Sequence, residues 1–161
     1  MAIEAGDRIP DTTLTVAGPD GPRPASTQEL FGGKRTALFA VPGAFTPTCS
    51  AKHLPGFKQR AGELKAKGID QIACVSVNDA FVMAAWAKDQ GITDEVVMLA
   101  DGSGDFTKAL GMDADFTKFG LGSRSQRYSM VIDDGVVESF NLEGPGEFRV
   151  SSADFMVDSL S

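Results

Sequence analysis

Histidine and cysteine are scarce in this sequence, which has one histidine, His53, and two cysteines, Cys49 and Cys74. Two cysteines cannot build a disulfide scaffold, and a chain of 161 residues is long enough to fold without one. A single histidine without a Cys-x-x-Cys pair also argues against a zinc site. We therefore expect no metal or other bound cofactor, and a chemical or purely steric role for the cysteines.

Basic clusters and long apolar segments are also missing. Fifteen Lys and Arg residues stand against 22 Asp and Glu, and the formal net charge is -7. Without a basic run to neutralise phosphates, nucleic acid is not an expected partner. The apolar runs are too short to cross a bilayer, and the start MAIEAGDRIPD has no signal-peptide pattern. These features predict a protein without a membrane partner, located in the cytoplasm.

The composition is typical of one globular domain. Hydrophobic residues make up 42% of the chain and charged residues 23%, and we find no repeat, linker or low-complexity segment. We expect a single domain over residues 1–161.

Strand and helix signals alternate along most of the chain. Short apolar runs predict buried strands at residues 36–41, 72–77 and 96–100. Capping residues and apolar spacing predict helices at residues 26–31, 47–67, 80–90 and 103–110. Pro55 predicts a kink or break in the second of these helices. The proline- and glycine-rich residues 18–24 predict a loop.

The last third of the chain departs from this alternation. Residues 128–132 and 136–140 flank Asp133-Asp134-Gly135 and predict a β-hairpin, and residues 152–160 predict a final helix. Strands alternating with helices, then a hairpin and a helix, indicate an α/β fold with a thioredoxin-like order. We expect a central mixed β-sheet with helices on both faces.

Residues 42–49 join a predicted buried strand to a predicted helix, which is where reactive groups collect in open α/β sheets. With Thr46 as N-cap and Pro47 at the first helical position, Cys49 falls in the first turn. Free backbone N–H groups and the helix dipole favour a thiolate there. The alternative is a small apolar filler beneath the strand. A thioredoxin-type dithiol is not available, because Thr46 stands where its first sulfur would be.

The pattern Pro42-x-x-x-Thr46-x-x-Cys49 resembles the active-site motif of the peroxiredoxins. The stretches VPGAFTPTCSAKHLPGF and ACVSVNDAFVMAAW resemble the type II, or peroxiredoxin-five-like, branch, and the likeness covers nearly the whole chain, most weakly after about Leu142. The resemblance implies that Cys49 attacks the peroxide, Thr46 hydrogen-bonds it and Pro42 shields the sulfur. It also implies an arginine that supports the thiolate and the transition state, and Arg127 matches that position better than Arg124.

Further residues are candidates for the pocket. His53 follows Cys49 by four residues and shares its face in a regular helix. It matches a histidine common in this branch, and we favour a packing or hydrogen-bonding role over that of a catalytic base. Four apolar residues could form a collar around the pocket, a dimer surface or plain core. They are Phe45, Phe116, Phe119 and Leu121. The family's small dimers suggest a homodimer.

A peroxidase of this kind must be reset, because its sulfenic acid has to condense with another thiol before further oxidation. An external thiol, either glutathione with glutaredoxin or a thioredoxin, is one source. The other is Cys74, which matches a second cysteine of plant-like type II members but falls in a predicted buried strand. The resemblance thus implies reduction of hydrogen peroxide and organic hydroperoxides in antioxidant defence, with the resetting thiol left open.

Two other functions fit a nucleophilic cysteine on an α/β fold. A cysteine-dependent hydrolase is one, although it needs a histidine base and His53 lies in the helix of the nucleophile itself. A non-catalytic thioredoxin-like binding or chaperone module is the other.

Overall fold

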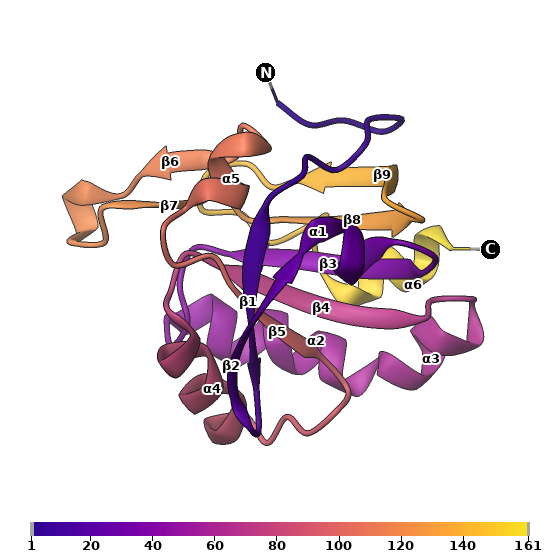
Figure 1. Cartoon of the computed structure of the whole chain (residues 1–161), viewed down its shortest axis with the longest axis horizontal. Coiled ribbons are helices and arrows are strands. Elements are labelled where there is room, and N and C mark those ends of the chain that lie inside the picture. The colour runs from indigo at the N-terminus through magenta and orange to yellow at the C-terminus, as the bar shows by residue number, and fades with distance from the viewer. Residues whose placement is uncertain (1, 161) are drawn as a thin grey trace.

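The computed structural model describes residues 2–160, and its centre is a seven-stranded mixed sheet in the order β2-β1-β5-β4-β3-β8-β9 (Figure 1). Strands β3, β4 and β5 are parallel to one another, and every other pairing is antiparallel. The strands are β1 Thr13–Gly18, β2 Gly21–Ser26, β3 Arg35–Val41, β4 Gln71–Ser76, β5 Val97–Ala100, β8 Tyr128–Asp133 and β9 Val136–Leu142.

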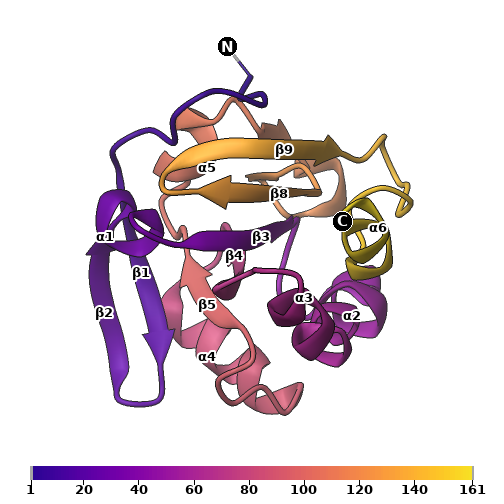
Figure 2. The same ribbon diagram turned by 90° about the vertical axis from the view of Figure 1, so that its right-hand side faces the viewer.

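Helices cover both faces of this sheet, as expected from the sequence (Figure 2). The helices are α1 Thr27–Phe31, α2 Leu54–Gln59, α3 Ala61–Ala66, α4 Ala80–Asp89, α5 Asp105–Ala109 and α6 Ala153–Ser159. Side chains of α2, α3, α4 and α6 share one apolar cluster with one face of β3 and β4. Side chains of α1 and α5 pack in a second cluster on the opposite face. This confirms the mixed sheet between two helical layers.

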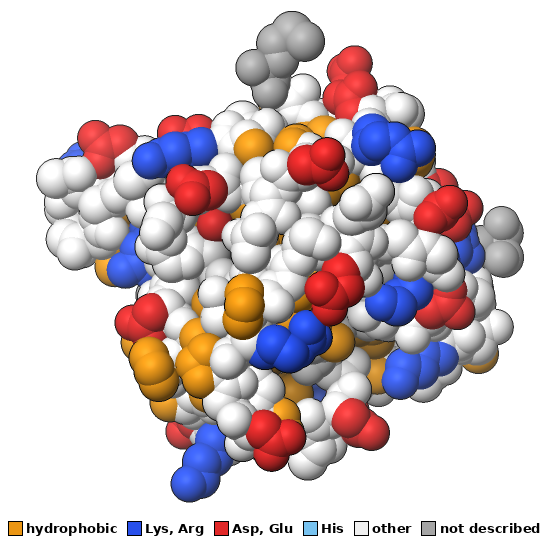
Figure 3. Space-filling view, viewed as in Figure 1, with side chains coloured by type: hydrophobic (Ala, Val, Ile, Leu, Met, Phe, Trp, Pro, Cys, Tyr) orange, Lys and Arg blue, Asp and Glu red, His pale blue; other side chains and the backbone are white. Residues whose placement is uncertain are grey.

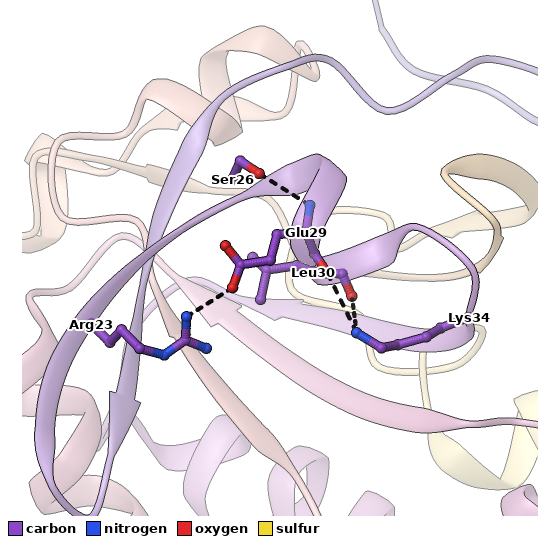
Figure 4. A network of polar contacts seen from close by, with 5 residues as sticks. All are labelled: Arg23, Ser26, Glu29, Leu30 and Lys34. Carbon is purple, nitrogen blue, oxygen red and sulfur yellow. Dashed lines mark hydrogen bonds and ion pairs between the residues drawn. The ribbon is translucent and has the colours of Figure 1, made fainter.

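Three helices begin at capping residues that were recognisable in the sequence. The hydroxyl of Ser26 accepts from the Glu29 backbone N–H at 3.0 Å, and Asp79 and Ser152 cap α4 and α6 in the same way. Figure 4 shows that the Glu29 side chain turns outward to Arg23, while Lys34 reaches back to carbonyls at the end of α1. Local hydrogen bonds therefore explain why these starts were predicted correctly.

The loop expected at residues 18–24 is wrong in part, because residues 21–26 form strand β2. Pro22 and Pro24 cannot donate to a strand ladder, which is why the sequence suggested a loop. Strand β2 lies at the edge of the sheet and pairs only with β1. An edge strand needs no hydrogen bonds on its outer side, so these prolines are tolerated.

The single helix expected at residues 47–67 is also corrected. After a start at Pro47, the chain forms a π-helical turn, η1, over Cys49–His53, followed by α2 and then α3, with the break at Arg60. Pro55 lies in the first turn of α2 and does not break it. Pro55 has no N–H to donate, and it directly follows η1, whose last bond runs from the Leu54 N–H to the Cys49 carbonyl; the helical segment continues through Pro55 to α2.

A small two-stranded sheet was not predicted. Strands β6, Asp113–Asp115, and β7, Ser123–Ser125, are joined through the 3₁₀ turn η2, Thr117–Phe119. The strands have three residues each and carry mostly polar side chains, so they show no alternating apolar pattern. This hairpin extends from the main sheet at the left of Figure 1.

Acidic and basic side chains are interspersed over the face in Figure 3, and apolar side chains gather at its lower left, over the region of α4. Among the described residues, no helix is both long and apolar enough to cross a membrane.

Candidate active site

Cys49 lies at the carboxyl end of β3, after the loop of residues 42–46. The helical segment begins at Pro47, and the Ser50 backbone N–H donates to the Thr46 carbonyl at 2.9 Å. Cys49 is fully buried within the apolar cluster on the α2 side of the sheet. The strand-to-helix junction of the sequence thus places the thiol in the first turn, close to the positive end of the helix dipole.

The turn that carries Cys49 is wider than an α-helical one. The Leu54 backbone N–H donates to the Cys49 carbonyl, five residues earlier, and this makes η1 a π-helical turn. The indole N–H of Trp86 on α4 donates to the Ser50 hydroxyl at 3.0 Å and joins the turn to α4. π-Turns are common at functional sites, and this one adjusts how Cys49 and His53 project into the interior.

Arg127 contacts the sulfur of Cys49. One terminal guanidinium nitrogen, Nη2, lies 3.0 Å from Cys49 Sγ. The strand pairing explains why Arg127 lies close to Cys49. Strand β8 runs antiparallel to β3 with Tyr128 opposite Ala40, so Arg127, one residue earlier, lies at the carboxyl end of β3. A permanent positive charge at this distance stabilises a thiolate.

Arg124, the competing candidate, has a different environment. Its Nε donates to the Leu121 carbonyl at 3.0 Å and its Nη1 to the Pro42 carbonyl at 3.4 Å. The first bond stays within the β6–β7 hairpin, and the second joins β7 to the loop after β3. Arg124 therefore supports the backbone around the site, while Arg127 reaches the sulfur.

His53 is fully buried and uses both ring nitrogens. Nε2 lies 2.9 Å from the Ser151 carbonyl, and Nδ1 lies 2.7 Å from Nη1 of Arg127. Burial, reinforced by the charge of Arg127, lowers the pKa of His53 to about 3, so the ring is neutral at physiological pH. A carbonyl only accepts, so Nε2 carries the proton and Nδ1 accepts from Arg127. The hydrogen-bonding role favoured from sequence is the one that this geometry allows, because no nitrogen is free to act as a base.

Thr46 and Pro42 lie at the mouth of the site. Both line a cavity of about 710 Å³ that Arg127 also lines. The Thr46 hydroxyl donates to the Gly43 carbonyl at 2.6 Å and makes no capping bond to the helix, contrary to the N-cap expected from sequence. Because its proton is used in this way, the lone pairs of the Thr46 oxygen remain available to accept a hydrogen bond from a ligand in the cavity.

The rest of the cavity wall is largely apolar. Phe116, Phe119 and Leu121 line it from the β6–β7 hairpin, and Phe148 lines it from the loop after β9. The apolar collar is thus present for three of its four expected members. Phe45 is half exposed and lies outside the lining, and His53 lies outside it too, behind Arg127.

The sequence reasoning missed Glu143 and the loop of residues 144–151 that follows it. This loop supplies Phe148, whose ring meets that of His53 edge-on at 4.9 Å, and Ser151, whose carbonyl accepts from His53. The signal that could have found it is the run Gly144-Pro145-Gly146 directly after a predicted strand, since functional residues often lie on such loops.

Cys74 lies in the middle of the sheet. It is opposite Phe39 on one neighbouring strand and Met98 on the other, and it is fully buried in the same apolar cluster as Cys49. Burial, reinforced by the nearby Cys49, raises the pKa of the Cys74 thiol well above its usual value. Both cysteines are free thiols. A thiol in this environment is inert unless the sheet opens locally.

Within residues 2–160, no group of three or more His, Cys, Asp or Glu side chains is arranged to hold a metal ion.

The chain is similar to a known protein family, to individual proteins and to solved structures. The Redoxin family model matches residues 4–156. Peroxiredoxin-2E, chloroplastic, of Arabidopsis thaliana is 55% identical over 163 residues, which cover 99% of the chain and 70% of the relative. Peroxiredoxin-2B of the same plant is 49% identical over 98% of both proteins. The crystal structure of reduced Prx3 in complex with H₂O₂ from Vibrio vulnificus superposes with a TM-score of 0.94 at 52% identity, covering 99% of each chain.

Proposed function

The chain belongs to the redoxin family and is a peroxiredoxin, a thiol-dependent peroxidase, and we propose that Cys49 is its peroxidatic residue. The observation that carries the proposal is the 3.0 Å contact between Arg127, which lines an apolar cavity, and the buried Cys49 sulfur behind it. The hydrolase alternative would need a histidine base, and both nitrogens of His53 are already bonded.

The reaction follows from the positions of these groups. The Cys49 thiolate attacks the terminal oxygen of a hydroperoxide, an S–O bond forms as the O–O bond breaks, and Cys49 becomes a sulfenic acid. The alkoxide that leaves takes a proton from water to become an alcohol. Arg127 stabilises the negative charge as it moves from sulfur to the departing oxygen, and Thr46 accepts from the peroxide O–H. Pro42 covers the approach to the sulfur.

We propose hydrogen peroxide and organic hydroperoxides as substrates. Phe116, Phe119 and Leu121 give the cavity apolar walls, and a volume of about 710 Å³ leaves room for an alkyl or aryl group beside the reacting oxygens.

We propose that an external thiol resets the enzyme, through glutathione with glutaredoxin or through a thioredoxin. The sulfenic acid condenses with this thiol to a mixed disulfide and releases water, and a second thiol then reduces the disulfide. The full burial of Cys74 supports the external route. A reducing compartment such as the cytoplasm would supply the thiol and agrees with two free cysteines; fractionation of the source cells tests this location.

Intact mass after one equivalent of peroxide tests the resetting route. We expect the chain alone to gain one oxygen, and with glutathione to gain a glutathione adduct at Cys49.

Cys74→Ser is expected to keep its turnover with glutaredoxin. It should also lower the free energy of unfolding by about 1–3 kcal/mol, because a hydroxyl replaces a thiol in apolar surroundings. Loss of two hydrogens in most wild-type molecules, mapped to a Cys49–Cys74 link, would instead make Cys74 the resolving residue.

We also propose that the chain forms a homodimer through the exposed apolar residues beside the cavity. Phe45 is 51% exposed and Phe119 is 71% exposed, and large aromatic side chains are costly to leave in water. We expect Phe119→Glu to convert a dimer to a monomer in sedimentation velocity at micromolar concentration. Phe155→Glu, on α6, is the matched control and should leave the sedimentation coefficient unchanged. A wild type that sediments as a monomer at every concentration would contradict the proposal.

A further inference from the structure

Glu143, directly after β9, is a buried carboxylate that holds a loop closed. Its Oε2 atom accepts from the backbone N–H groups of Arg149, Val150 and Ser151 at 2.7, 2.9 and 2.7 Å, and from the Ser151 hydroxyl at 2.7 Å. Burial opposes ionisation of Glu143, but these donors together hold its pKa below the usual value. The carboxylate is therefore charged at neutral pH, and it binds the far end of the 144–151 loop to the end of β9.

The closed loop delivers two groups to His53. The Ser151 carbonyl meets Nε2 at 2.9 Å, and the Phe148 ring packs edge-on against the imidazole at 4.9 Å. Since the same Ser151 donates its N–H and its hydroxyl to Glu143, the carboxylate determines where the carbonyl points. The carbonyl in turn keeps the proton of His53 on Nε2.

The line of contacts continues to the sulfur. With its proton on Nε2, His53 presents the lone pair of Nδ1 to Arg127 at 2.7 Å, and the other terminal nitrogen of Arg127 lies 3.0 Å from Cys49 Sγ. Glu143 also contacts Arg127 directly, because its backbone N–H donates to the Arg127 carbonyl at 3.0 Å. Both the backbone and the guanidinium of Arg127 are thus held by bonds that start at Glu143.

We propose that Glu143 is a positioning residue of the peroxidase: its carboxylate fixes the 144–151 loop, and through Ser151 it selects the neutral His53 tautomer that aims Arg127 at Cys49. The proposal rests on the proposed function, since it concerns how the arginine beside the reactive sulfur is held. Glu143 also lines the cavity that Thr46, Pro42 and Arg127 share, but its Oε2 atom is bonded to the loop, and the proposed effect passes through that loop.

The charges around His53 predict what happens when the loop opens. The charged groups that act on the ring are Arg127, just before β8, and Glu143, just after β9, while Cys49, in the same turn as His53, contacts the far side of the Arg127 guanidinium. The remaining neighbours, Phe39, Phe57 and Phe148, are aromatic. Removing the negative charge of Glu143 would by itself lower the pKa of His53 further. Opening the loop admits water to the ring and raises the pKa toward its usual 6.5. A raised His53 pKa in a Glu143 variant would therefore indicate a positioning role, and a lowered pKa would indicate only the loss of a nearby charge.

The test uses the fact that His53 is the only histidine of the chain. In untagged wild-type protein, imidazole ¹⁵N NMR should show a neutral ring with the proton on Nε2 at every pH from about 8 down to about 5. In Glu143→Ala, the ring should titrate near pH 6 and both tautomers should be populated. Below this midpoint the imidazolium repels Arg127. The rate constant with hydrogen peroxide should then fall about tenfold relative to wild type at the same pH.

Matched variants separate positioning from a general loss of structure. Glu143→Gln keeps an acceptor for the loop N–H groups and should restore most of the wild-type His53 spectrum. Glu138→Gln removes a carboxylate within β9, the strand that ends just before Glu143; Glu138 pairs with Arg35, and this variant should leave both the spectrum and the rate unchanged. In Glu143→Ala/His53→Gln, the added pH dependence should disappear, because an amide makes both hydrogen bonds without titrating.

A folded Glu143→Ala protein whose His53 stays neutral to pH 5 on the Nε2 tautomer would overturn the proposal. If Glu143→Ala does not fold, Ser151→Ala decides. It deletes one of the four bonds to the carboxylate and should raise the pKa of His53 by a smaller amount, and an unchanged His53 there would equally overturn the proposal. The NMR readout does not depend on peroxidase activity. A failure of the proposed function would leave the His53 spectra as stated, and a failure here would leave the reaction at Cys49 intact.

Discussion

Replacing Cys49 with serine is expected to lower the peroxidase rate constant by roughly four orders of magnitude or more, to the level of the reaction without enzyme. A serine hydroxyl is not ionised at neutral pH, and the helix N-terminus and Arg127 cannot make it a comparable nucleophile. The measurement is the consumption of hydrogen peroxide by purified protein with dithiothreitol, supported by intact mass, which should show no oxygen added at residue 49.

The fold should survive this substitution, because serine is close to cysteine in size and the Trp86–Ser50 bond of the same turn is not involved. Cys74→Ser is the matched control, since it removes the other buried thiol and should keep the peroxide reaction. Peroxide turnover at the wild-type rate in Cys49→Ser would show that another residue is the nucleophile.

Replacing Arg127 with alanine is expected to lower the rate constant with peroxide by about 10²–10³-fold, the usual cost of losing a preorganised donor at a site of developing charge. Within residues 2–160, the variant loses the only charged group found within hydrogen-bond distance of the Cys49 sulfur, and it leaves Nδ1 of His53 without its donor. Alkylation by iodoacetamide, which needs the thiolate, should also slow at neutral pH. The fluorescence of Trp86, the only tryptophan, gives a stopped-flow signal because its indole contacts the residue after Cys49.

Two variants sharpen this result. Arg127→Lys keeps a positive charge, but the guanidinium of Arg127 contacts His53 with one terminal nitrogen and Cys49 with the other, and lysine has a single ammonium nitrogen. This variant should therefore have a rate constant between those of Arg127→Ala and the wild type. Arg124→Ala should leave iodoacetamide alkylation unchanged, since its guanidinium bonds only to backbone carbonyls. If Arg124→Ala slowed both reactions and Arg127→Ala slowed neither, the charge that activates Cys49 would belong to Arg124.

Local sequence determined most of the secondary structure. Each of the capping side chains, those of Ser26, Asp79 and Ser152, accepts a hydrogen bond from the backbone N–H three residues later. Both partners of each bond therefore lie within one short stretch of sequence. The turn between β8 and β9 is similar, because Asp134 and Gly135 both adopt positive φ and an Asp-Gly pair tolerates that backbone. Such elements can be predicted from sequence because their stabilising contacts are short-range.

The wrong predictions depended on position in the fold. Pro22 and Pro24 indicate a loop until β2 is known to be the edge strand, where a missing N–H costs no ladder bond. Likewise, the apolar spacing after Pro47 predicts a regular helix. The π turn at Cys49–His53 forms within the packing against α4 and the sheet. Sequence periodicity does not report these tertiary contacts.

The site divides in the same way. Pro42, Thr46 and Cys49 lie within eight consecutive residues on one strand-to-helix junction, so the sequence alone determined that a thiol would stand at a helix start beside a hydroxyl. Arg127 meets Cys49 only because β8 pairs antiparallel with β3 in a register that brings residue 127 to the end of that strand. Ser151, which is bonded to Glu143, reaches His53 only because the loop after β9 folds back over the buried imidazole. The position of the nucleophile Cys49 therefore depends on its neighbours in sequence. The position of Arg127, and of the residues that hold it, depends instead on strand register and loop closure, which bring together segments far apart in the chain.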